Sequence, residues 1–68
     1  MTIEEKRYVK DVTKRMIDAF DEQEIAPYMQ IAIASMMILQ ICDNDEYSDE
    51  EFDDQLKTIK ECWKDLKE

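Results

Sequence analysis

The longest uncharged stretch of this chain lies at its centre. Residues 25–42, with the sequence IAPYMQIAIASMMILQIC, contain no charged side chain, whereas the segments on both sides are dense in charge. On a helical wheel of about 100° per residue, the polar side chains Gln30, Ser35 and Gln40 point in three different directions. Pro27 suits a first helical turn, where its missing N–H is not needed. We therefore predict a helix over residues 27–42 that is apolar on nearly every side.

The segment before it alternates apolar and charged positions with helical periodicity. Apart from Ile3 and Ile17, which fall among the basic residues opposite, its apolar side chains lie within one arc of roughly 120° on the wheel. They are Tyr8, Val9, Val12, Met16, Ala19 and Phe20. Thr2 followed by Glu5 has the spacing of a capping box, which marks a helix start. We predict a helix over residues 3–24, separated from the next by the restriction that a proline places on the preceding residue.

The segment after the apolar stretch has one narrow apolar seam. The seam repeats at intervals of four and three residues, as in coiled-coil packing. It consists of Phe52, Leu56, Ile59, Trp63 and Leu66. Ser48 and Glu51 form a second capping-box pattern, so we predict a helix over residues 49–67. In this helix we expect Trp63 to anchor the core.

These elements predict an all-α protein: a single helical domain, residues 1–68, with a bundle-like protomer of three helices around the central apolar one. The two outer stripes can cover only part of the central helix, and monomers rarely expose large apolar patches. We therefore expect a homo-oligomer whose interface contains Met29, Ile33, Met36 and Met37. The alternative occupant of that face is another protein. A membrane span is disfavoured, because both flanks are acidic and neither carries the positive charge that sets topology.

Composition excludes most catalytic chemistry. The chain has no His, no Gly and one Pro, which removes the usual general base at neutral pH, phosphate-binding loops and tight hairpins. Cys42 and Cys62 have no His beside them and form no CxxC, so we expect two buried, reduced cysteines and neither a metal site nor a cofactor. The charged N-terminus predicts no secretory signal, and with the free thiols it indicates a cytoplasmic protein. We expect no enzymatic activity.

Charge is the other strong feature. With 9 Lys and Arg against 18 Asp and Glu, the net charge is −9, which repels nucleic acid and suits a basic partner protein. Eight carboxylates lie between residues 43 and 54, where they could imitate nucleic-acid phosphates. The predicted partner-binding residues are Asp45, Glu46, Asp49, Glu50 and Asp53. The alternative is a solvated loop and helix start.

Two metal readings of the acidic residues fit poorly. A calcium loop beginning at Asp43 fails at Tyr47, where a ligand is needed, and at Ser48, where a glycine is needed. A magnesium site like that of helical nucleotide pyrophosphohydrolases needs paired ExxE and ExxD motifs, of which only fragments occur here.

Basic residues form a stripe on the first predicted helix. Arg7, Lys10 and Lys14, with Tyr8 available to stack on a base, could bind an anionic nucleotide in an oligomer. The alternative is ordinary pairing at i,i+4. The pairs would be Arg7 with Asp11, Asp11 with Arg15, and Lys14 with Asp18.

In size and charge, though in no motif, the chain resembles small acidic helical proteins of phages and mobile elements that act as inhibitors. That resemblance implies a viral-type binding protein that acts stoichiometrically on a partner. The alternatives are an oligomer that sequesters a nucleotide signal, and a structural component of a larger assembly.

Overall fold

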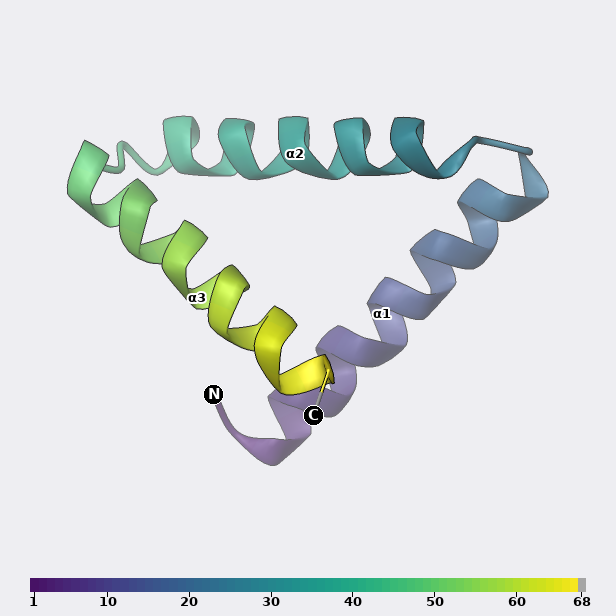
Figure 1. Ribbon diagram of the computed structural model, residues 1–68, viewed down its shortest axis with the longest axis horizontal. Coiled ribbons are helices and arrows are strands. Elements are labelled where there is room, and N and C mark those ends of the chain that lie inside the picture. The colour runs from purple at the N-terminus through teal and green to yellow at the C-terminus, as the bar shows by residue number, and fades with distance from the viewer. Residues whose placement is uncertain (68) are drawn as a thin grey trace. The chain divides into compact units, whose positions relative to one another are not determined.

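Three α-helices contain nearly all of residues 1–67, the part of the chain that this computed structural model describes (Figure 1). The helices are α1 (Ile3–Glu22), α2 (Pro27–Asn44) and α3 (Asp49–Lys67). No β-strand occurs in residues 1–67, so the predicted all-α class is confirmed. All three predicted helix starts and the end of α3 are confirmed, whereas α1 ends two residues earlier and α2 two residues later than predicted.

Both predicted capping boxes form. The backbone N–H of Glu5 donates to Thr2 Oγ1 at 3.1 Å, and the N–H of Thr2 donates to Glu5 Oε1 at 3.3 Å. At α3 the N–H of Glu51 donates to Ser48 Oγ at 3.2 Å, and the N–H of Ser48 donates to Glu51 Oε1 at 3.1 Å. These bonds satisfy amides that a helix start leaves without partners, which is why short local patterns fixed both starts.

A left-handed residue ends α1. Glu24 has φ 58°, and its N–H donates to the carbonyl of Asp21 at 3.0 Å. The N–H of Ile25 donates to the carbonyl of Phe20 at 3.0 Å, which completes a Schellman motif. Ile25 and Phe20 are both half-buried, as expected for the apolar contact that accompanies this motif. Because of this motif α1 ends at Glu22, and residues 23 and 24 lie outside the helix.

The same motif ends α2. Glu46 has φ 55°, its N–H donates to the Asp43 carbonyl at 3.1 Å, and the Tyr47 N–H donates to the Cys42 carbonyl at 3.0 Å. Because these carbonyls are satisfied beyond the apolar stretch, α2 runs through Asp43 to Asn44.

Glu46→Gly is expected to stabilise the chain, because glycine adopts a positive φ without the clash that a Cβ causes. The free energy of unfolding should rise by about 0.5–1 kcal/mol, part of the gain being offset by the greater freedom of glycine in the unfolded chain. Urea unfolding at a fixed protein concentration measures it. Glu61→Gly, inside α3, is the matched control and should lower the same quantity by about 1 kcal/mol. A loss of stability in both variants would contradict the role given to Glu46.

The chain divides into two compact units, Met1–Ser35 and Met36–Glu68. In the first unit, the Gln30 side chain ties the start of α2 to the end of α1. Its Nε2 donates to the Ile25 carbonyl at 2.8 Å and to Asp21 Oδ1 at 2.9 Å. Gln30 is half-buried, and its acceptors lie in the last turn of α1 and in the connection to α2, so this side chain holds the two helix ends together.

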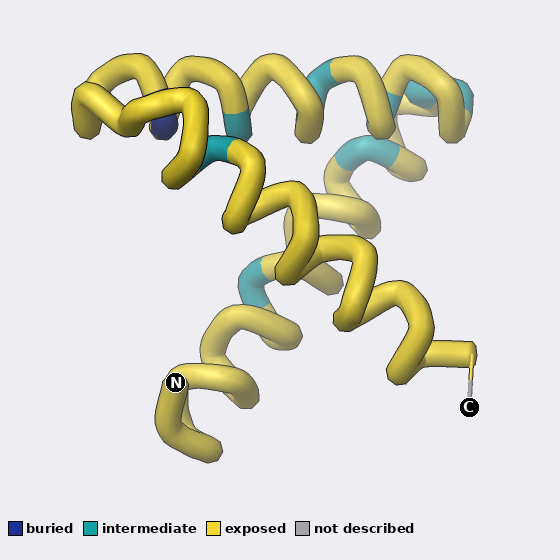
Figure 2. The backbone as a smooth tube through the Cα atoms, turned by 60° about the vertical axis from the view of Figure 1, so that its left-hand side comes forward, coloured by how far each residue is buried: buried dark blue, intermediate teal, exposed yellow. Residues whose placement is uncertain are grey.

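Burial is sparse throughout the described part of the chain. Cys42 is the one buried residue among residues 1–67 (Figure 2). The predicted burial of Cys62 is wrong, and so is the expectation that Trp63 anchors a core, since its side chain is 58% exposed. Beyond Phe52, every residue of the apolar seam of α3 is exposed. The bundle-like packing and the single domain over residues 1–68 stay predictions.

Candidate functional site

The four residues predicted to form an oligomer interface lie on α2, and most of them are exposed. Met29 is 46% exposed, Met36 is 56% exposed and Met37 is 39% exposed, while Ile33 is half-buried. We call these four residues the methionine face. On the helical wheel they span roughly 100°, so a single approaching surface could cover all of them.

Other directions around α2 are also uncovered. Tyr28 is 73% exposed and Leu39 49%, and these two point nearly the same way on the wheel, whereas Ile31, at 66%, and Ile41, at 55%, point in two other directions. A helix surrounded by exposed apolar side chains is energetically unfavourable in water, because each large side chain that stays wet forgoes about 1.5–3 kcal/mol of burial. This exposure agrees with the inference from the sequence that the apolar stripes of the two outer helices can cover only part of the central helix.

The acidic segment, Asp43–Asp54, covers the end of α2, the following turn and the first turns of α3. Asp45 and Glu46 lie in the turn, Asp49 and Glu50 in the first turn of α3, and Asp53 one turn later, and all five are exposed. Within residues 1–67, the one salt bridge is between Asp11 and Arg15, so no carboxylate of the acidic segment is neutralised by a basic side chain. The predicted partner-binding residues are thus exposed, and none of them makes a salt bridge within the described residues.

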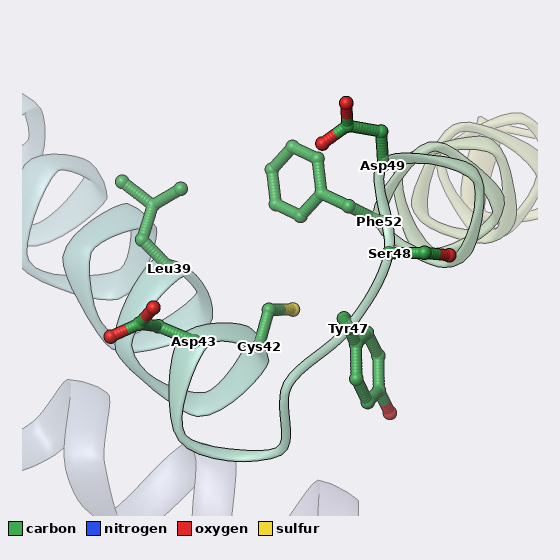
Figure 3. Close-up of a pocket in the computed structure, with 7 residues that line it drawn as sticks. All are labelled: Leu39, Cys42, Asp43, Tyr47, Ser48, Asp49 and Phe52. Carbon is green, nitrogen blue, oxygen red and sulfur yellow. The ribbon is translucent and has the colours of Figure 1, made fainter.

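A shallow, open pocket of about 170 Å³ lies at the same turn (Figure 3). Its lining combines apolar and acidic side chains. The lining residues are Leu39, Cys42, Asp43, Tyr47, Ser48, Asp49 and Phe52. Asp43 and Asp49 belong to the carboxylates predicted to face a partner, whereas the other five lining residues had not been predicted as site residues. The available signal was the capping box, since Tyr47 precedes the cap and Phe52 is the fourth helical residue, the positions at which apolar side chains often fix a helix entry.

The basic stripe lies on α1. Arg7, Lys10 and Lys14 fall within an arc of roughly 60°, whereas Tyr8 lies about 100° from Arg7, on the apolar arc of the helix; all four are exposed. Of the three ion pairs predicted along this helix, the pair between Arg15 and Asp11 forms. Neither Arg7 nor Lys14 makes a salt bridge within the described residues. Nucleotide binding there stays a prediction.

Two further properties concern the described residues alone. No helix in residues 1–67 combines the length and the apolar character needed to cross a bilayer. In the same range, no three His, Cys, Asp or Glu side chains are grouped so that they could hold a metal ion.

Comparison with known proteins gives no relative: no protein family, curated protein or solved structure matches this chain.

Proposed function

We propose that this chain is a non-enzymatic binding protein that works as a homo-oligomer of bundle-like helical protomers and occupies a basic surface of a partner protein. The observation that carries the proposal is the exposure of apolar side chains around α2 in a chain with one buried residue among those described. A 68-residue chain has little core of its own and usually gains stability from disulfides, metals or association. Of these three sources of stability, association between chains is the one that fits the exposed apolar side chains of α2.

The methionine face is the proposed interface between copies. In a two-fold dimer the same patch meets itself, so Met29, Ile33 and Met36 of one copy would be covered by the same residues of the other. Methionine side chains are flexible and polarisable, and they fill the irregular gaps of such a contact well. Three of its four residues, Met29, Met36 and Met37, are exposed in the single chain and so available for such a contact.

The acidic segment is the proposed contact with the partner. Its carboxylates are exposed and free of salt bridges within residues 1–67, which leaves their charge available to a basic groove. Charge of one sign at this density accelerates association with an oppositely charged surface and makes the complex sensitive to salt. A protein that fills a nucleic-acid-binding groove in this way acts as a stoichiometric inhibitor.

Neutralising three acidic side chains tests this proposal. The variant Asp45→Asn, Glu46→Gln, Glu50→Gln should bind a captured basic protein at least about tenfold more weakly, because rim charges govern association with such a groove. The probe is the heparin-binding fraction of a cell lysate, which is enriched in proteins with basic grooves. The captured protein is then allowed to bind duplex DNA. Added wild-type chain should displace the DNA from it.

The matched control carries the same change in charge on α1 and in the turn that follows it. Asp18→Asn, Glu22→Gln, Glu24→Gln should capture the same protein as the wild-type chain, and about 0.5 M salt should release it from both. Equal capture by the two triple variants, or a complex that salt does not weaken, would overturn the inhibitor proposal.

A further inference from the structure

The seam of α3 is progressively uncovered toward the C-terminus. Phe52 is half-buried beside the pocket, but Leu56 is 43% exposed, Ile59 48%, Trp63 58% and Leu66 80%. Four large apolar side chains at coiled-coil spacing are therefore exposed, to a growing extent, along three turns of one helix. This seam is separate from the methionine face, which lies on α2.

Charge is divided along α3. The first half carries Asp49, Glu50, Glu51, Asp53 and Asp54 and no basic residue, whereas residues 57–67 carry four lysines against Glu61 and Asp65, a net charge of +2. No salt bridge joins two residues of α3 within the described residues. Lys67 Nζ lies 4.6 Å from the centroid of the Trp63 ring, which places a positive charge at the edge of the seam. A helix with one acidic and one basic half is complementary to a second copy of itself running in the opposite direction.

We propose that α3 pairs with the α3 of a second copy in an antiparallel coiled coil. With Ile59 beside its counterpart on the two-fold axis, Leu56 packs against Trp63 and Phe52 against Leu66 of the other copy. The seam residues of each helix thereby cover those of its partner. The interface deepens the proposed homo-oligomer by naming a second contact between copies, and it does not depend on the methionine face.

The flanking charges fix the direction. In the antiparallel arrangement, Asp53 lies beside Lys67 of the other copy, and this pair occurs twice by symmetry. Lys60 meets its own counterpart near the axis, which offsets part of that gain. A parallel arrangement would instead align the two acidic halves, which is unfavourable. Asp53 then belongs to the rim of this interface, and the other four predicted partner-binding residues remain open to a basic protein.

A designed disulfide tests the geometry. Gln55 and the exposed Cys62 flank the seam on one side, and in the antiparallel pair residue 55 of each copy lies beside residue 62 of the other. Within one helix the two positions are seven residues apart, about 10 Å, which is too far for a disulfide. Mild oxidation of Gln55→Cys should therefore give a covalent dimer. Asp54→Cys, on the outer side of the helix, is the control and should stay uncrosslinked.

A charge exchange tests the pairing independently. Asp53→Lys and Lys67→Glu should each weaken the dimer about tenfold in sedimentation equilibrium, and the two together should restore its affinity to within about threefold. Failure of the double variant to recover, or crosslinking of Gln55→Cys no greater than that of Asp54→Cys, would overturn the antiparallel pairing. If the chain associates but does not crosslink, the homo-oligomer proposal stands and only the pairing of α3 is contradicted. If the crosslinked dimer forms but captures no basic protein, only the inhibitor proposal is contradicted.

Discussion

Replacing Met29 and Met36 with glutamate is expected to weaken self-association through α2 at least about 100-fold. Each substitution removes an apolar side chain worth about 1.5–3 kcal/mol of burial and puts a charge at the centre of the contact. The two residues are 46% and 56% exposed in the single chain, so the substitutions disturb little within it. Sedimentation equilibrium over a dilution series measures the change.

The matched control places the same two charges on α1. Ile3→Glu with Ile17→Glu substitutes side chains that are 71% and 45% exposed and lie among the charged residues of that helix. This variant should associate as the wild-type chain does. If the control dissociates as readily as the methionine variant, the effect is one of net charge, and the methionine face is not the interface.

Cys42→Ser is expected to lower the free energy of unfolding by about 1–2 kcal/mol. Cys42 is the one buried residue of the described chain, and a hydroxyl there loses water without gaining a strong partner. The cost stays moderate because a serine on a helix can donate to the carbonyl four residues earlier, as Ser35 does to Ile31 at 2.9 Å. Urea unfolding at one protein concentration measures it.

The chain carries its own control for this prediction. Cys62→Ser makes the same chemical change at an exposed thiol and should alter stability by less than about 0.5 kcal/mol. Equal losses in the two variants would show that the packing around Cys42 contributes nothing particular.

Local patterns predicted the helix starts well and the helix ends less well. A capping box is a property of four neighbouring residues, so Thr2 with Glu5 and Ser48 with Glu51 were sufficient to place two starts. Helix ends are usually marked by glycine, which this chain lacks. Glu24 and Glu46 take the left-handed positions instead, and nothing in the identity of a glutamate signals that conformation.

Periodicity predicted which side chains share a face, but it does not reveal what covers that face. The seam through Trp63 lies on one side of α3 as expected, yet its residues are exposed in the chain. For the same reason Cys62 was wrongly assigned to the interior. The pocket lined by Cys42 and the hydrogen bonds that Gln30 makes to the end of α1 depend on the path of the chain between helices. The spacing of hydrophobic residues does not determine that path.

The solution mass of the purified chain tests the need for association most directly. Multi-angle light scattering at micromolar concentration, with circular dichroism on the same sample, should find a helical particle of at least twice the 8.2 kDa chain mass. A stable, fully helical particle of 8.2 kDa would contradict it, because one chain would then hold its helices together without a partner copy.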